Sequence, residues 1–297
     1  MNNLIVIVGP TGVGKTDLSI HLAKYLNTEI ISCDSRQFYK ELKIGAAPPN
    51  INQLKNVKHH FIHHKSIKEN YNAGLFEIDA IKTITKLFKS NDHLVAVGGS
   101  GLYIDALCQG FNKMPNISEK TRNIVNNKFN KNGLSWLQQK VKIIDPVFYN
   151  NCDNKNHRRL LRVLEIYETT GEKISNLRKN KIKKRPFKII KIGLDLERNL
   201  LYDRINIRVD KMIVSGLLNE VKSLVPFNNH NALKTVGYEE LFAFYNGKNN
   251  LDESIKLIKR NTRRLAKRQI TWFKKDKKTK WFNPKNRQDI INFISKL

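Results

Sequence analysis

The sequence predicts an α/β protein in which a core built on a parallel β-sheet carries a helical insertion and includes a basic C-terminal helix. Apolar runs of strand length alternate with helical patterns through the first third of the chain, and a further strand is expected at residues 187–196. Between these parts, helical periodicity continues with no strand pattern. We therefore expect a discontinuous core of residues 1–110 and 187–297, interrupted by an insertion at residues 111–186.

The first element is an apolar run, Leu4 to Val8, which leads into the loop GPTGVGKT at residues 9–16. The loop fits the pattern G-x-x-x-x-G-K-[ST], and an amphipathic helical pattern follows from near Lys15. Inward-turned amides, a helix N-terminus and the lysine charge bind phosphate, while Thr16 can place its hydroxyl on Mg²⁺. This context favours a P-loop NTPase-like core over an ordinary glycine-rich turn. The expected phosphate-binding residues are Gly9, Pro10, Thr11, Gly12, Val13, Gly14, Lys15 and Thr16.

Two further apolar runs of the core end in polar residues. The run Glu29 to Cys33 ends at Asp34, and the run at residues 93–97 ends in the turn GGSG, which contains Ser100. In parallel sheets with right-handed crossovers, ligands bind at the carboxyl ends of the strands. We therefore expect Asp34, Ser100 and the phosphate loop to share one crevice.

Asp34 begins the polar cluster DSRQFY. An acid at a strand end beside Ser35, Arg36, Gln37 and Tyr39 suits a general base that also handles a ligand with hydrogen-bonding edges. Glutamine matches the donor and acceptor pair of adenine, and arginine matches phosphate or guanine. The alternative is that Asp34 caps the next helix. The strand before Gly98 offers no second acid of the kind that ATP chemistry uses for Mg²⁺.

The insertion reads as helices with polar connectors. Ser118 offers one helix start, Asp153 or Asn154 offers a second, and Gly171 is expected to end a helix.

The last long helical pattern is the basic one. Asp252 and Glu253 suit its first turn, and Ile258, Leu265 and Trp272 are expected on its buried side. Six cations crowd the remaining positions, which favours a nucleic-acid contact over an ordinary solvated face. These are Lys256, Arg260, Arg263, Arg264, Lys267 and Arg268.

The bulk composition points in the same direction. The net charge is +28, which indicates a polyanionic partner, although a Lys-, Asn- and Ile-rich chain also follows from an AT-rich genome. The three cysteines show no disulfide or metal-ligand spacing, and no apolar run is long enough to span a bilayer. We expect a cytoplasmic protein with no signal peptide and no membrane association.

Seven blocks, in order along the chain, resemble those of the bacterial tRNA dimethylallyltransferases, the isopentenyl-adenosine synthases of the IPP transferase family. The phosphate loop alone is unspecific, but its combination with the DSRQ block, the GGSG turn and the TRRLAKRQ-TWF tail is very specific. The blocks are GPTGVGKT (9–16), DSRQFYKELKIGAA (34–47), GGSGLYIDAL (98–107), RRLLRVLEIYETTG (158–171), GLDLERNLLYDRINIRVDKMI (193–213), TVGYEEL (235–241) and IKRNTRRLAKRQITWF (258–273).

The resemblance implies transfer of a dimethylallyl group from dimethylallyl diphosphate to N6 of the adenosine 3′ of the tRNA anticodon, position 37, without ATP. The phosphate loop then holds the diphosphate leaving group, and Asp34 is the general base. Ser100 stands where the family usually has threonine and would bond the oxygen of the breaking C–O bond. Lys15, Mg²⁺ and Arg208 would stabilise the departing diphosphate, with Arg204 as the alternative arginine.

By the same resemblance, the anticodon stem-loop of tRNA contacts the strand ends and the insertion. The expected residues are Asp34, Ser35, Arg36, Gln37, Ser100, Arg122, Arg158, Arg159, Leu160, Leu161 and Arg162. The segment GAAPPN (45–50) departs from the family's Gly-Thr-Ala-Lys-Pro, which is expected to weaken a tRNA or phosphate contact. The segment KHHFIHHK (58–65) carries four histidines, but we expect no dedicated zinc site there.

Two alternatives stay open at the level of sequence. A P-loop small-molecule kinase explains the loop and Asp34 but not the basic tail or the arginine-rich insertion. A non-catalytic RNA-binding P-loop protein explains the charge but gives Asp34 no role. In every case we expect a monomer.

Overall fold

The computed structural model describes residues 2–112, 114–178 and 183–296. The chain forms two compact units: the core unit, Met1–Gln109 with Lys184–Leu297, and the insertion unit, Gly110–Lys183. The sequence placed the first junction after residue 110 and the second before residue 187, one and three residues from these bounds. Each unit has a hydrophobic core of its own.

The core unit is built on a six-stranded sheet of order β3-β2-β4-β1-β5-β6. Every pairing in it is parallel, so the predicted parallel sheet is confirmed. The short outer strands β3 and β6 were not predicted from the sequence, because neither carries a run of apolar residues. The strands are β1 (Asn3–Val8), β2 (Ile30–Ser32), β3 (His59–His60), β4 (His93–Val97), β5 (Lys188–Leu194) and β6 (Lys280–Phe282).

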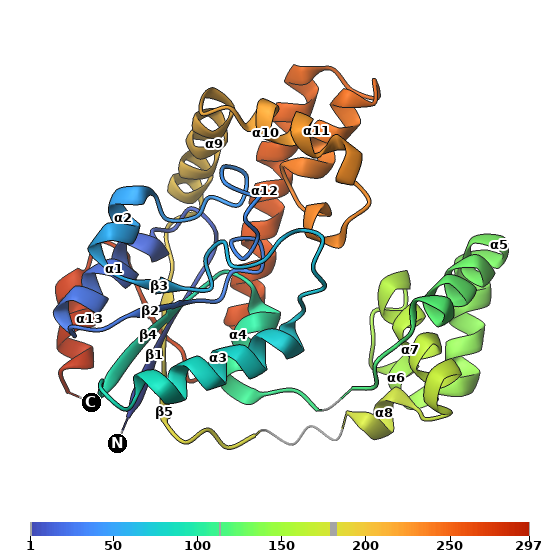
Figure 1. Ribbon diagram of the computed structural model, residues 1–297, viewed down its shortest axis with the longest axis horizontal. Helices are drawn as coiled ribbons and strands as arrows, with labels where there is room; N and C mark the ends of the chain where they lie inside the picture. The colour runs from blue at the N-terminus through green and yellow to red at the C-terminus, as the bar shows by residue number, and fades with distance from the viewer. Residues whose placement is uncertain (1, 113, 179–182, 297) are drawn as a thin grey trace. The chain divides into compact units, whose positions relative to one another are not determined.

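Both faces of the sheet are covered by helices, as Figure 1 shows for α1 and α13 on one side and α3 and α4 on the other. Successive side chains of a strand point to opposite faces. Accordingly Leu4 and Val6 of β1 pack with α3 and α4, whereas Ile5 and Ile7 pack with α1 and α13. A strand buried on both faces is continuously apolar, which is why β1 was readable from the sequence.

Helices connect the parallel strands of the core unit, and most of the remaining helices follow β5 in the chain. They are α1 (Lys15–Tyr25), α2 (Ile51–Asn56), α3 (Ala73–Leu87), α4 (Gly101–Gln109), α9 (Arg198–Val214), α10 (Leu217–Leu224), α11 (Tyr238–Tyr245), α12 (Leu251–Phe273) and α13 (Arg287–Ile294), with 3₁₀ turns η1 (Val225–Phe227) and η2 (Asn231–Leu233).

The basic helix α12 begins with a capping box in which the Asn250 side chain accepts from the Glu253 amide, and Asp252 and Glu253 lie in its first turn as predicted. Its buried residues are Ser254, Ile258, Ala266 and Phe273. The expectation for Ile258 is confirmed. Trp272 is half-buried and packs against the core, as expected for the buried side, whereas Leu265 is half-buried beside the fully buried Ala266. A seven-residue spacing drifts around a helix of 3.6 residues per turn, so the buried stripe moves to neighbouring positions.

The helices of the insertion unit are α5 (Glu119–Ile144), α6 (Pro146–Asn150), α7 (His157–Thr170) and α8 (Ile174–Leu177), and no strand occurs among the residues of the unit that the structure describes. Ser118 caps α5 by accepting from the Thr121 amide, and Gly171 ends α7 with a left-handed φ of 71°. Both were predicted. The start of α7 was misplaced, because its cap is Asn156 rather than Asp153 or Asn154.

No helix among the described residues is long and apolar enough to cross a membrane. Cys33, Cys108 and Cys152 are free thiols.

Asp145 is the polar residue on which the insertion unit depends most. Its carboxylate is fully buried and accepts from the amides of Phe148 at 3.0 Å and Ser175 at 2.8 Å, which joins α6 to α8. We expect Asp145→Ala to lower the free energy of unfolding by about 2–4 kcal/mol, because two buried amides lose their acceptor. Urea denaturation of the full chain measures this. The control, Asp153→Ala, removes a carboxylate on the exposed surface, and an equal effect of the two substitutions would contradict the prediction.

Candidate active site

The carboxyl ends of three neighbouring strands form the candidate site. β2, β4 and β1 are adjacent in the sheet, and they end at Asp34, at the turn containing Ser100 and at the phosphate loop respectively. A small cavity of about 30 Å³ lies at this edge. It is lined by Lys15, Thr16, Ser19, Ser32, Asp34, Gln37, Pro49, His59, Val97 and Gly98. The strand ends therefore meet as the sequence predicted.

The phosphate loop holds the lysine ammonium at the centre of the loop. Lys15 Nζ donates to the carbonyl oxygens of Gly9 at 3.0 Å and Pro10 at 2.8 Å. Gly9 has φ 145°, and a Cβ there would lie 2.7 Å from the Leu194 carbonyl oxygen, so no other residue fits. Burial lowers the pKa of Lys15 to about 8, although the carboxylate of Asp34 partly restores it. The charge of Lys15 is thus available to an anion at neutral pH.

Gln269 of α12 ties the phosphate loop to the GGSG turn. Its Oε1 accepts from the Thr11 amide at 2.8 Å, and its Nε2 donates to the Gly99 carbonyl at 2.8 Å. A Cβ on Gly99 would lie 2.5 Å from this Nε2, so the turn needs glycine for the close approach. Sequence reasoning gave Gln269 no role. The only available signal was its place in the TRRLAKRQ block.

Asp34 lies in a turn and caps no α-helix. Its Oδ1 accepts from the Arg36 amide at 3.1 Å, and the next helix, α2, is capped by Asn50. The alternative that Asp34 caps the next helix is therefore wrong. Burial lowers the pKa of Lys15 and of Arg208, and the carboxylate of Asp34 partly offsets this lowering at both groups. The three charged groups therefore lie within electrostatic range of one another.

Ser100 and Ser35 join the ends of β4 and β2. The Ser100 hydroxyl accepts from the Ser35 amide at 3.0 Å and donates to Ser35 Oγ at 3.0 Å. Serine keeps the hydroxyl that the family's threonine has. The predicted pair Asp34 and Ser100 is therefore brought to the same edge of the sheet.

Arg36 and Gln37 make extensive contacts inside the protein. The Arg36 guanidinium donates to the carbonyls of Asn231 at 3.1 Å, Ala232 at 2.9 Å and Lys234 at 3.1 Å. Gln37 Nε2 donates to the Ala47 carbonyl at 3.1 Å, but the residue still lines the cavity. Of the two, Gln37 has the geometry for a ligand contact.

The two candidate arginines of α9 differ in position. Arg204 is exposed and donates to the Val13 carbonyl at 3.4 Å, on the outer side of the loop. Arg208 donates to the Ala47 carbonyl at 3.3 Å, and its charge lowers the pKa of Lys15. Burial in turn lowers the pKa of Arg208. This geometry favours Arg208 over Arg204 as the arginine of the site.

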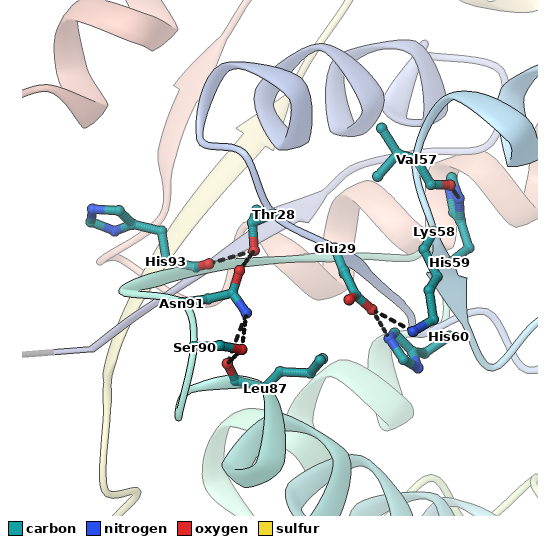
Figure 2. Close-up of polar contacts among 10 residues, drawn as sticks. All are labelled: Thr28, Glu29, Val57, Lys58, His59, His60, Leu87, Ser90, Asn91 and His93. Atoms are coloured by element: carbon teal, nitrogen blue, oxygen red, sulfur yellow. Dashed lines mark hydrogen bonds and ion pairs between the residues drawn. The ribbon is translucent and has the colours of Figure 1, made fainter.

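His59 is a second residue that sequence reasoning missed. Figure 2 shows its ring against the Val57 carbonyl, 2.8 Å from Nδ1, while the neighbouring His60 meets Glu29 at 2.5 Å. The Nε2 of His59 is buried and has no hydrogen-bond partner among the described residues. Burial lowers the pKa of His59, so the neutral ring can accept a hydrogen bond from a ligand in the cavity.

The predicted tRNA-binding residues of the insertion unit separate into two groups. Arg122, Arg158 and Arg159 are exposed, and Arg162 is half-buried beside Glu165. Leu160 and Leu161 are buried in the core of the unit, so their side chains are structural and the contact expected here falls to the arginines. Arg178 lies near two of these arginines. Burial, and then the charges of Arg159 and Arg162, lower the pKa of Arg178.

Most of the cations predicted on α12 are exposed to solvent. Arg263 is half-buried and donates to Asn206 Oδ1 at 2.7 Å, so it holds α9. The others are exposed: Lys256, Arg260, Arg264, Lys267 and Arg268.

The sequence matches the protein family described as IPP transferase over residues 37–276. The chain belongs to the IPP transferase family. It is 50% identical over 286 residues to tRNA dimethylallyltransferase 2 of Azobacteroides pseudotrichonymphae, covering 96% of this chain and 93% of that protein. The crystal structure of full-length tRNA isopentenylpyrophosphate transferase from Bacillus halodurans matches with TM-score 0.74 and 36% identity, over 100% and 96% of the two chains. A structure of a eukaryotic dimethylallyltransferase acting on tRNA matches with TM-score 0.73 and 29% identity, over 92% and 70%.

The resemblance drawn from the motif blocks and the predicted P-loop NTPase-like fold class are thus confirmed. Family membership places this IPP transferase among prenyl-transferring enzymes. The roles of its individual site residues remain predictions.

The lowered pKa of Lys15 predicts how this IPP transferase binds an anion as pH changes. Because the pKa is about 8, affinity for inorganic pyrophosphate is expected to fall above pH 8 as the ammonium loses its proton. The effect on stability has the opposite sign. Between about pH 8 and pH 10.5, the ordinary pKa of lysine, the unfolded chain binds more protons than the folded chain. This group therefore makes the free energy of unfolding rise with pH.

Calorimetric titration of pyrophosphate from about pH 7 to about pH 9.5 tests this. The control is Lys15→Arg, which stays charged throughout and reports the ionisation of the ligand itself. Identical pH profiles for the two proteins would contradict the prediction.

Proposed function

We propose that this IPP transferase moves a dimethylallyl group from dimethylallyl diphosphate to N6 of the adenosine 3′-adjacent to the tRNA anticodon, position 37. The relatives' names, tRNA dimethylallyltransferase and tRNA isopentenylpyrophosphate transferase, support the reaction class. The single observation that carries the proposal is the edge at which Asp34, Ser100 and Lys15 lie at the ends of three adjacent strands.

The reaction breaks the bond between C1 of the dimethylallyl group and the diphosphate oxygen, and forms a bond between C1 and adenine N6. The N6 proton passes to the carboxylate of Asp34, and the electron pair of the C–O bond leaves with the diphosphate. An exocyclic amine is a poor nucleophile, so a positioned base is expected to contribute about 10²- to 10⁴-fold. The Ser100 hydroxyl, which contacts the amide and the hydroxyl of Ser35, is proposed to bond the leaving oxygen.

The phosphate loop serves the leaving group in this proposal. Charge develops on the diphosphate in the transition state, and fixed donors and cations stabilise it without reorganising. Lys15, Arg208 and the loop amides supply these. The hydrogen bonds of both cations go to backbone carbonyls, so their charges stay available to the diphosphate.

Mg²⁺ fits the oxygen-lined part of the cavity. The described residues contain no cluster of three or more His, Cys, Asp or Glu side chains suited to a metal, and the cavity instead presents Thr16, Ser32 and Asp34. Mg²⁺ commonly keeps several waters and binds few protein oxygens together with substrate phosphates. We propose that Thr16 holds the ion with the diphosphate, where it neutralises charge on the leaving group.

tRNA is proposed to bind through arginines and lysines on both units. On the insertion unit these are Arg122, Arg158, Arg159 and Arg162, and on the core unit the exposed cations of α12. Ser35, Arg36 and Gln37 are proposed to lie near the target nucleotide. An adenosine in a loop leaves its stack at a cost of only a few kcal/mol, so it can reach a crevice of this kind.

We further propose that the enzyme acts in the cytoplasm as a monomer. Three free thiols suit a reducing compartment. Size-exclusion chromatography with light scattering tests the oligomeric state.

The direct test incubates the purified chain with Mg²⁺, unmodified tRNA and labelled dimethylallyl diphosphate, with ATP omitted. We expect label on the adenosine beside the anticodon. A transfer that needs ATP, or ATP turnover with a small acceptor, would favour a kinase and overturn the proposal.

Substitution of Asp34 tests the proposed general base directly. We expect Asp34→Asn to lower kcat by about 10²- to 10⁴-fold, because the amide cannot take the N6 proton. tRNA affinity, measured by filter binding, is expected to stay within about twofold of the wild-type value, because the amide keeps the shape and removes only one charge.

The matched control is Asp92→Asn, which changes an exposed carboxylate at the opposite end of β4. Undiminished transfer by Asp34→Asn would instead support a non-catalytic role for this edge.

A further inference from the structure

Glu220 of α10 lies outside the cavity, and its carboxylate is saturated with hydrogen bonds. Oε2 accepts from the amides of Lys43 at 2.8 Å and Ile44 at 2.7 Å. Oε1 accepts from the Gly45 amide at 3.0 Å and from the Tyr238 hydroxyl at 2.7 Å. A carboxylate has about four acceptor positions, and here all of them are used.

The three consecutive amides form a concave cluster of donors of the kind that binds anions. The carboxylate therefore fixes the start of the loop at residues 43–47, which we call the anchored loop. Tyr238 fixes how closely the anchored loop packs, because its ring is fully buried and a Cβ on Gly45 would lie 2.6 Å from the ring. Burial, followed by the Glu220 charge, raises the pKa of Tyr238, so the phenol stays a donor.

The far end of the anchored loop reaches two residues of the candidate active site. Its Ala47 amide donates to the Ile44 carbonyl at 2.9 Å, and Ala47 has the unusual φ of 46°. The Ala47 carbonyl accepts from Gln37 Nε2 at 3.1 Å and from Arg208 Nη2 at 3.3 Å. One carbonyl therefore holds the amide and the guanidinium together.

We infer that Glu220 is a positioning residue for this enzyme: through the anchored loop and the Ala47 carbonyl it sets where Arg208 and Gln37 lie. The inference rests on the proposed function in assigning Arg208 to the diphosphate. The link is made of backbone atoms. It therefore does not need the threonine and lysine side chains that the segment 45–50 lacks relative to the family.

The consequence for binding follows from charge. The Asp34 carboxylate acts on Arg208 through space, so a guanidinium released from Ala47 is drawn toward Asp34. Such a movement removes a cation from the diphosphate and also makes Asp34 a weaker base. Glu220 is therefore expected to affect both diphosphate affinity and kcat from outside the cavity. tRNA affinity is expected to change much less, because the proposed tRNA contacts are mostly surface cations far from the anchored loop in the chain.

Glu220→Gln tests the inference, since the amide group has only one acceptor oxygen to offer the loop. We expect the Kd of inorganic pyrophosphate to rise about tenfold and kcat for transfer to fall, while the Kd of tRNA changes by less than about twofold. The matched control is Glu240→Gln. Glu240 also caps a backbone amide, that of Gly237, and accepts from Asn261, but it does not touch the anchored loop. Equal rises in pyrophosphate Kd for the two variants would overturn the inference.

A double substitution separates positioning from a general structural effect. If Glu220 acts through Arg208, adding Glu220→Gln to Arg208→Ala produces little further loss of pyrophosphate affinity. Fully additive losses would overturn the inference. Gly45→Ala serves where Glu220→Gln does not fold: it displaces the anchored loop with the carboxylate intact, and the same non-additivity with Arg208→Ala is expected.

Pyrophosphate binding keeps this test distinct from that of the proposed function. A wild-type chain that binds pyrophosphate but transfers no dimethylallyl group would disprove the proposed function, while the role of Glu220 would still be decided by the binding data.

Discussion

The parallel pairing of β2 with β4 and of β4 with β1 is the constraint on which the rest of the structure depends. Parallel neighbours end at the same edge, so each strand delivers its following residue to one place. Asp34, Ser100 and the phosphate loop come from segments far apart in the chain, and no local interaction could gather them. The buried apolar faces of β1 stabilise this arrangement by packing against helices on both sides.

At the edge where these strands end, the cations of the site donate hydrogen bonds to backbone carbonyls. Lys15 donates to Gly9 and Pro10, Arg208 donates to Ala47, and Arg36 donates to three carbonyls near η2. A carbonyl orients a cation without neutralising it, whereas a direct carboxylate partner would compete with an incoming anion. Under the proposed function, this arrangement would let Asp34 act as a base while the cations keep their charge for the leaving group.

The two units are stabilised by different interactions. The core unit is built around the parallel sheet. In the same unit, Gln269 of α12 links the phosphate loop to the GGSG turn. The described part of the insertion unit is helical, and it relies on a small apolar core and on the buried carboxylate of Asp145. Its leucines at positions 160 and 161 belong to that core, which leaves the neighbouring arginines at the surface.

The sequence by itself determined the α/β class, the phosphate loop and the helical pattern of the insertion, because apolar periodicity and glycine spacing are local properties. The family came from the resemblance of seven motif blocks. The sequence also located β2 and β5 to within a residue or two, because each strand lies in a mostly apolar run. Tertiary structure alone decided that Arg208 rather than Arg204 lies beside Lys15, since both arginines stand on one helix and only packing distinguishes their faces. It also decided the roles of Gln269, His59 and Glu220. Gln269 and Glu220 bond to residues far away in the chain, and His59 lines a cavity formed by distant segments. Such long-range contacts leave no periodic trace in a sequence.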